Sequence, residues 1–259
     1  MNQIKIAFFD IDGTLIDMER KAVSGKTLEA LHRLQENGTK ICIATGRSPI
    51  EIPEFPGADF DVFLTFNGSY CFTGSKTIFS NPIPREDVRK LIENAEQLGR
   101  PVTLATKDRL ASNGSDRDLA DYHAVSDTPV IVADDFDEVA SDEDVYQIMM
   151  GGRSEEYPAI TKNVEGAEIT AWWDRAVDII PKNGGKGLGV RKVLEFYGLD
   201  ESEAIAFGDG DNDIAMFKAV GNSVAMANAS KNLRRVATDS CSHVKDDGIY
   251  HYCLENGLI

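Results

Sequence analysis

Three short apolar segments of the chain end in side chains that could take part in phosphate or metal chemistry. These side chains are Asp10 and Asp12 after the first segment, Thr45 after the second, and Asp209 and Asp213 after the third. In a doubly wound α/β sheet the carboxyl ends of the parallel strands lie at one edge, where ligands bind. We therefore expect four carboxylates and one hydroxyl within one small volume.

Four ionised carboxylates cannot lie close together, away from water, unless a cation neutralises part of their charge. Carboxylate oxygens are the ligands that Mg²⁺ prefers. Mg²⁺ usually keeps several waters and binds one or two carboxylates together with a substrate phosphate. The sequence therefore predicts a Mg²⁺ site at this edge of the sheet.

Lys186 lies in the glycine-rich segment Asn183–Gly187, at the start of a predicted helix. Helix N-termini and glycine amides favour anions, and the ammonium group adds a positive charge. Together with the metal and the hydroxyl, this lysine indicates a phosphate site, although a solvated surface lysine is the alternative. The chain contains no GxxxxGK[ST] loop, so we assign the phosphoryl group to a substrate rather than to a nucleotide cofactor. Asp10 could attack that group.

The segments that position these side chains alternate between strand and helix patterns, which predicts an α/β fold with a doubly wound parallel sheet. The predicted strands are short apolar runs, at residues 4–9, 39–44, 62–66, 204–207 and 222–227. The predicted helices have helical apolar spacing or capping residues, in segments that begin near residues 24, 186, 214, 231 and 248.

The pattern changes over residues 82–182, which we interpret as an inserted α/β domain that splits a core formed by residues 1–81 and 183–259. This insertion contains 11 basic and 22 acidic residues, so it carries most of the formal net charge of −16. Solubility is the simplest explanation of that charge, and an influence on which anions approach is the alternative. Residues 168–173 and 176–181 are expected to form a closing hairpin, in which Trp172 and Trp173 point to opposite faces.

The composition of the 259-residue chain limits the classes of partner. An excess of 43 acidic over 27 basic residues repels a polyanion, so nucleic acid is an unfavourable partner. No apolar run approaches the roughly 20 residues that span a bilayer, and residues 1–9 do not resemble a signal peptide. The sequence therefore predicts a cytoplasmic protein with no membrane partner, and it gives no indication of the oligomeric state.

Four segments in this order resemble the motifs of the haloacid dehalogenase superfamily of phosphatases. They are the sequences DIDGT from Asp10, TGR from Thr45, KG from Lys186 and GDGDND from Gly208. The position of the insertion, between the second and third motifs, is similar to that in the Cof-type subfamily, whose α/β cap is called type IIB. The resemblance spans almost the whole chain and implies a Rossmann-like core with a cap domain.

The resemblance also implies a role for each motif residue. Asp10 would be the nucleophile that forms an aspartyl-phosphate, and Asp12 the general acid and later the general base. Mg²⁺ would be held by the Asp10 carboxylate, the Asp12 backbone carbonyl and the Asp209 carboxylate, with Asp213 close by. The phosphoryl group would be bound by Thr45, Gly46, Lys186 and Asn212.

Some residues of these motifs could instead have a purely structural role. Thr45 could cap a helix, and Asp211 is more easily explained as a solvent-exposed or capping residue than as a metal ligand. Arg47 could reach the substrate or form an ion pair with a carboxylate of the core.

The function expected from the resemblance is Mg²⁺-dependent hydrolysis of a small phosphorylated metabolite, with sugar phosphates as candidates. A phosphomutase that uses the same intermediate is the alternative enzyme, and release of free phosphate without a bisphosphate primer distinguishes the two. A non-catalytic phosphate-sensing protein would bind phosphate without turnover, but the intact Asp10 and Asp12 argue against it.

Overall fold

The computed structural model describes residues 3–125, 128–171 and 173–259, so Trp172 lies outside the described residues. The chain forms two compact units, which are described separately. The core unit consists of Met1–Arg47, Pro53–Ser80 and Gly184–Ile259. The inserted unit consists of Ser48–Ile52 and Asn81–Asn183.

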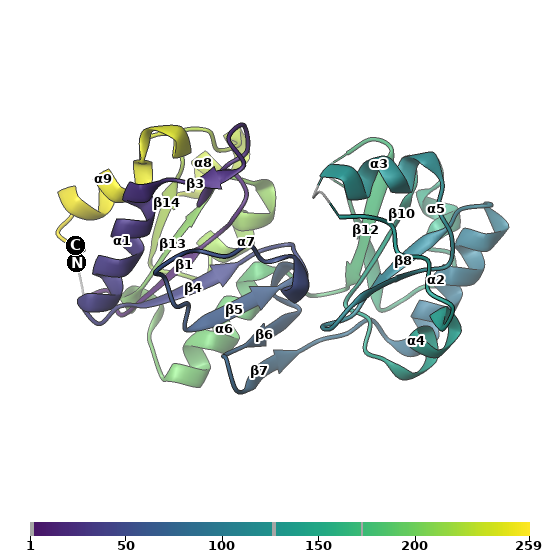
Figure 1. Cartoon of the computed structure of the whole chain (residues 1–259). Helices are drawn as coiled ribbons and strands as arrows, with labels where there is room; N and C mark the ends of the chain where they lie inside the picture. Colours follow the sequence, from purple (N-terminus) through teal and green to yellow (C-terminus); the bar gives the residue numbers. More distant parts are fainter. Residues whose placement is uncertain (1–2, 126–127, 172) are drawn as a thin grey trace. The chain divides into compact units, whose positions relative to one another are not determined.

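The core unit contains an eight-stranded sheet in the order β15-β14-β13-β1-β4-β5-β6-β7 (Figure 1). The strands from β15 to β5 are parallel, and β6 and β7 are antiparallel. The strands are β1 (Ile6–Phe9), β4 (Lys40–Ala44), β5 (Val62–Thr65), β6 (Tyr70–Phe72), β7 (Thr77–Ser80), β13 (Ala204–Gly208), β14 (Asn222–Ala225) and β15 (Asp239–Ser240). The chain winds outward in both directions from β1, which confirms the doubly wound α/β fold.

Helices cover both faces of this sheet. On one face, Phe8 is in a buried cluster with Val190 of α6 and Leu233 of α8, and α7 packs against both of these helices. On the other face, the ring of Phe207 lies edge-on to Tyr252 of α9, and α9 contacts α1. The helices are α1 (Gly25–Glu36), α6 (Lys186–Tyr197), α7 (Ile214–Phe217), α8 (Lys231–Val236) and α9 (Gly248–Glu255).

The register of the central strands brings their carboxyl ends together. Phe9, the last residue of β1, pairs with Ile43 of β4 and with Phe207 of β13. The residues that follow these three strands therefore lie next to one another. The 3₁₀ turn η2 (Phe66–Gly68) directly follows β5, and the 3₁₀ turn η4 (Asp211–Asp213) comes shortly after β13.

The inserted unit contains an antiparallel five-stranded sheet in the order β11-β12-β10-β8-β9. Its strands are β8 (Val102–Ala105), β9 (Leu110–Ser112), β10 (Gln147–Gly151), β11 (Ala167–Thr170) and β12 (Ala176–Pro181). Its helices are α2 (Arg85–Gln97), α3 (Arg117–Val125), α4 (Phe136–Asp142) and α5 (Tyr157–Ile160), and residues 49–51 form the 3₁₀ turn η1 (Pro49–Glu51). The pairing of β11 with β12 confirms the hairpin predicted from the sequence.

The two faces of this second sheet differ in character. Apolar residues of alternate positions, such as Leu104 and Ile148, form a buried cluster with residues of α2, α4 and α5. The opposite face is mixed, with the buried polar residues Thr103, Gln147 and Asp178 among apolar ones, and it contacts α3, whose Tyr122 donates a hydrogen bond of 2.6 Å to Asp178 of β12. In the part of the chain that the structure describes, no helix has both the length and the apolar character needed to cross a membrane.

The two-residue strands of the core unit could not have been predicted from the sequence. The hairpin of β2 (Ile16–Asp17) and β3 (Ala22–Val23) and the edge strand β15 have only two residues each. Two residues are too few to show the alternation that indicates a strand in a sequence.

Candidate active site

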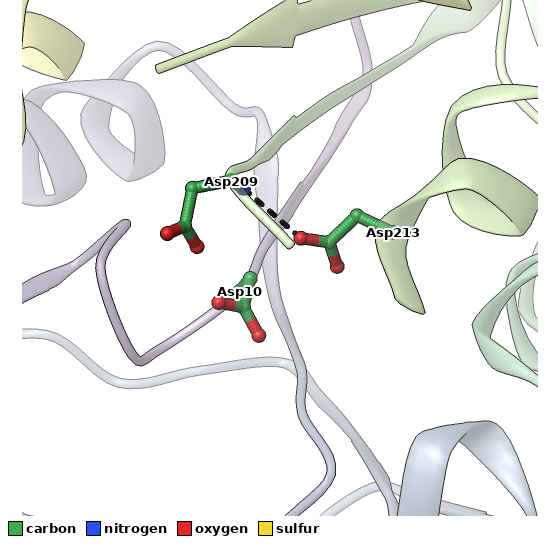
Figure 2. Close-up of side chains that lie close together, drawn as sticks. All are labelled: Asp10, Asp209 and Asp213. Atoms are coloured by element: carbon green, nitrogen blue, oxygen red, sulfur yellow. Dashed lines mark hydrogen bonds between the residues drawn. The ribbon is translucent and has the colours of Figure 1, made fainter. Parts of the chain in front are cut away.

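Three carboxylates come together at the carboxyl edge of the core sheet. Asp10 follows β1, whereas Asp209 and Asp213 belong to the segment after β13 (Figure 2). One carboxylate oxygen from each residue lies within 4.8 Å of those of the other two. The sequence prediction that these strand ends place carboxylates side by side is therefore confirmed for these three residues.

Lys186 lies between two of these carboxylates. It is the first residue of α6 and is fully buried. Its Nζ donates hydrogen bonds of 2.6 Å to Asp10 Oδ1 and to Asp213 Oδ1. Burial alone would lower the pKa of Lys186, but the charges of the two carboxylates and the hydrogen bonds to them raise it above its ordinary value. The alternative that this residue is a solvated surface lysine is wrong.

The site holds more negative than positive charge. Burial raises the pKa of Asp10 well above its ordinary value; Lys186 opposes this shift, whereas Asp213 and Asp209 add to it. Burial and the charge of Asp213 raise the pKa of Asp209 to about 6. One ammonium therefore does not balance three clustered carboxylates, and a hard divalent cation bound by oxygen ligands fits this donor set.

Hydrogen bonds fix the orientation of Asp209 and Asp213. The Oδ2 atom of Asp213 accepts hydrogen bonds of 3.0 Å from the backbone amides of Asp209 and Gly210 (Figure 2 shows the first). Asp209 accepts a hydrogen bond of 3.2 Å from each of Thr14 Oγ1 and Asn228 Nδ2. Both carboxylate oxygens of Asp213 therefore accept hydrogen bonds, from Lys186 and from the backbone of the loop after β13. The Asp209 carboxylate lies beside Asp10.

The Asp12 carboxylate was expected to lie in the same cluster, but the cluster of described residues contains only Asp10, Asp209 and Asp213, so this part of the sequence prediction is wrong. Arg47 binds the Asp12 carboxylate with two parallel hydrogen bonds, of 2.9 Å from Nε to Oδ2 and of 2.7 Å from Nη2 to Oδ1. Of the two alternatives for Arg47, the structure shows the ion pair, and its partner is the carboxylate two residues after Asp10. Both side chains are partly exposed.

Thr45 is buried in the loop after β4. Its Oγ1 accepts a hydrogen bond of 3.1 Å from the backbone amide of Arg47, which leaves the hydroxyl proton available to another acceptor. The next helical turn, η1, has Ser48 as its N-cap, so Thr45 does not cap a helix. Gly46, the second predicted substrate-binding residue of this loop, follows directly.

The other two polar side chains of the Asp209 loop are exposed. Asn212 Nδ2 donates a hydrogen bond of 3.1 Å to Asn67 Oδ1. Asp211 accepts hydrogen bonds from Ser230 and Asn232 at the start of α8, and the Ser230 bond is the main cause of its lowered pKa. Asp211 therefore holds the start of a helix, as the sequence favoured, and does not belong to the carboxylate cluster.

Two asparagines at this edge were not predicted. Asn228, in the loop after β14, donates to Asp209 and also, at 2.7 Å, to the backbone oxygen of Gly13. Asn67, in the turn after β5, contacts Asn212. Both follow parallel strands of the sheet, so the rule that identified Asp10 and Asp209 would have found them if it had been applied to every strand.

Replacement of Lys186 by methionine is expected to lower the free energy of unfolding of the metal-free protein by about 3–5 kcal/mol, because it leaves buried carboxylates without their cation. Urea denaturation in EDTA measures this loss. Lys192→Met, in the same helix, removes only an exposed ion pair with Glu195 and should change stability little. Equal effects of the two substitutions would show that the buried charges are compensated in another way.

The doubly wound sheet, the buried lysine and the clustered aspartates together define an enzyme of the phosphate-transferring class. Residues 7–253 match the family model of the haloacid dehalogenase-like hydrolases. The chain belongs to this family, as the four motifs indicated, and it is a phosphatase.

Individual relatives agree with this family. YkrA of Bacillus subtilis, assigned as a phosphatase, is 30% identical over 98% of both chains. The 5-amino-6-(5-phospho-D-ribitylamino)uracil phosphatase YitU of the same organism is 27% identical over 95% of both chains. The solved structure of the sugar phosphatase BT4131, of subclass IIB, matches with a TM-score of 0.83 and 29% identity over 98% of this chain and 100% of that one. These likenesses cover the core and inserted units together.

Proposed function

We propose that this phosphatase hydrolyses a small phosphorylated metabolite in a Mg²⁺-dependent reaction, through an aspartyl-phosphate on Asp10. The observation that carries the proposal is the position of the fully buried Lys186, whose Nζ lies 2.6 Å from both Asp10 and Asp213, beside the partly buried Asp209. A cation next to a nucleophilic carboxylate can bind the phosphoryl oxygens as that carboxylate attacks.

In the first step, a carboxylate oxygen of Asp10 attacks phosphorus and the bond between phosphorus and the leaving oxygen breaks. Asp12 gives a proton to that oxygen, so the product leaves as an alcohol. In the second step, Asp12 takes a proton from water as the water oxygen attacks the same phosphorus. The bond between Asp10 and phosphorus then breaks, which releases phosphate and restores both carboxyl groups.

We propose that the carboxylates of Asp10 and Asp209 and the backbone carbonyl of Asp12 bind Mg²⁺ directly. Asp213 would bind the metal through a water molecule or support the direct ligands. The charge surplus of the cluster supports this assignment, as does the fixed orientation of Asp209. The bound metal supplies positive charge that neutralises the phosphoryl oxygens and the carboxylates. Lys186 then orients Asp10, and we assign direct phosphoryl binding to Thr45, Gly46 and Lys186. The resemblance implies a contact from Asn212 as well, but Asn212 Nδ2 donates to Asn67 Oδ1, so we assign it a supporting role in the phosphoryl site.

We assign the insertion predicted from the sequence, residues 82–182, to a type IIB cap that recognises the leaving group, and residues 1–81 and 183–259 to the catalytic core. All the residues assigned to the chemistry lie outside the insertion, which supports this division. The relative YitU acts on a phosphorylated ribitylaminouracil and BT4131 is a sugar phosphatase. Small phosphorylated metabolites, with sugar phosphates among them, are therefore the substrates to test first.

The metal requirement is tested by a matched pair of aspartates in one loop. Phosphate release should disappear in excess EDTA and return with Mg²⁺. Asp209→Asn should weaken Mg²⁺ binding by at least about 10- to 100-fold, because changes of this size follow even from the loss of residues that only support a metal ligand. Asp211→Asn, which alters an exposed carboxylate bonded to Ser230 and Asn232, should leave Mg²⁺ binding unchanged. Calorimetric titration with Mg²⁺ and an assay of free phosphate measure both effects.

The same assay tests the class of reaction. Release of free phosphate without any bisphosphate primer excludes the phosphomutase alternative. Full turnover in EDTA by protein that contains no metal would contradict the Mg²⁺ proposal.

A further inference from the structure

The turn Phe66–Gly68 after β5 is part of the carboxyl edge that forms the candidate site. The backbone amides of Phe66 and Asn67 donate hydrogen bonds of 3.0 and 2.9 Å to the carbonyl oxygens of Arg47 and Thr45. On its other side the turn packs against the start of α6. A Cβ on Gly68 would lie 2.9 Å from the Gly185 carbonyl oxygen. The turn is therefore fixed between the Thr45 loop and Lys186.

The backbone of this turn is strained. Phe66 and Asn67 have φ angles of +50° and +53°, in the left-handed region. Asparagine adopts this region more readily than most residues, whereas a bulky residue such as phenylalanine does so rarely. Such strain persists where the surroundings over-determine the conformation, and it is concentrated at functional sites. The strained backbone turns the Asn67 side chain toward the loop after β4.

The carboxamide of Asn67 has a defined orientation. Its Oδ1 accepts the 3.1 Å hydrogen bond from Asn212 Nδ2. Its Nδ2 lies against Gly46, where a Cβ would be 3.3 Å from that atom, a close approach that a larger side chain would hinder. Asn67 Nδ2 has no hydrogen-bond partner among the residues that the structure describes. Its two N–H donors therefore remain available beside Thr45.

We propose that Asn67 binds an oxygen of the phosphoryl group through Nδ2, and that Asn212 acts as a positioning residue that holds the Asn67 carboxamide. A neutral amide donor stabilises a phosphate dianion without adding charge that would compete for the clustered carboxylates. The Thr45 hydroxyl and Lys186 lie on the two elements that flank the turn. This inference rests on the proposed function, because it names a further residue of the same phosphate site.

The test compares two left-handed asparagines. Asn67→Gly retains the backbone conformation and removes only the carboxamide. It should weaken binding of inorganic phosphate, measured by calorimetry with Mg²⁺ present, and lower kcat/KM, each by about 10- to 100-fold, the value of a hydrogen bond to a charged group. Asn163→Gly, at an exposed residue of the inserted unit with a φ of +60°, should change neither. Asn67→Asp should weaken phosphate binding further, because it places a negative charge there.

Asn212→Ala should lower phosphate affinity less than Asn67→Gly does. It should have little added effect when both substitutions are combined, because its role depends on Asn67.

If Asn67→Gly lowers thermal stability or kcat but leaves phosphate affinity within twofold of wild type, Asn67 is structural and the inference is wrong. In that case, phosphatase activity of the wild-type protein would still support the proposed function. If the wild-type protein binds phosphate but releases none from any substrate, the proposed function fails while the binding role of Asn67 is still measured.

Discussion

Asp10→Asn is expected to reduce phosphate release by about 10⁴-fold or more, because an amide cannot form the aspartyl-phosphate and losses of this size follow the removal of a nucleophile. The substitution should not unfold the protein, since the amide oxygen can still accept the hydrogen bond from Lys186 that Asp10 Oδ1 accepts now. Steady-state phosphate release and thermal unfolding measure the two effects in the same preparation.

Mass spectrometry of intact protein, quenched during turnover, supplies the direct control. Wild-type protein should gain the mass of one phosphoryl group, and the Asp10→Asn variant should gain none. The mass of the variant also has to exclude deamidation back to aspartate, which would restore activity. Substantial phosphate release from verified variant would remove Asp10 as the nucleophile, while its fold and its family would be unaffected.

The core of the fold could be predicted because each of its parts has a local sequence signal. Buried parallel strands such as Ile6–Phe9 and Ala204–Gly208 are apolar on both faces and end in polar loops. Ser24 accepts a hydrogen bond from the Thr27 amide and so begins α1 where the capping pattern placed it. The doubly wound arrangement arises because connections of one hand run outward from β1 in both directions, which places helices on both faces of the sheet.

The site was predictable to the extent that it depends on strand ends. Asp10, Asp209 and Asp213 meet because β1 and β13 are neighbours in register. Asn67 and Asn228 were missed because an asparagine after a strand is also a common kind of turn residue. The pairing of β5 with β4, and of β14 with β13, places these turns at the same edge as the carboxylates.

The ion pair of Asp12 with Arg47 could not be derived from the sequence. Its two residues are 35 positions apart, and the choice between substrate and a core carboxylate depends on the rotamer of a long side chain. The pair also has a mechanistic consequence. The guanidinium holds the Asp12 carboxylate in one orientation, outside the Asp10 cluster, so acid–base function and metal binding are assigned to different parts of the same loop.

Asp12→Ala separates the two proton transfers that we assign to this residue. With p-nitrophenyl phosphate, whose leaving group is a weak base, phosphorylation of Asp10 needs little help from a general acid. Attack of water on the aspartyl-phosphate still needs a base, and the loss of that base normally costs about 10²–10⁴-fold. The variant should therefore release about one nitrophenolate per active site in a fast burst and then turn over slowly.

Rapid-quench kinetics and intact-protein mass should show the phosphorylated enzyme accumulating on the timescale of the burst. Asp12→Asn is the matched control, because its amide oxygen can still accept a hydrogen bond from Arg47 but cannot take a proton at neutral pH. A burst in both variants assigns the effect to the lost base, whereas a burst in the alanine variant alone would implicate the freed Arg47. If both variants bind Mg²⁺ and substrate yet show a slow linear phase without phosphorylated protein, Asp12 acts before the covalent intermediate forms. The step that it controls would then be the attack by Asp10, and the water would need another base.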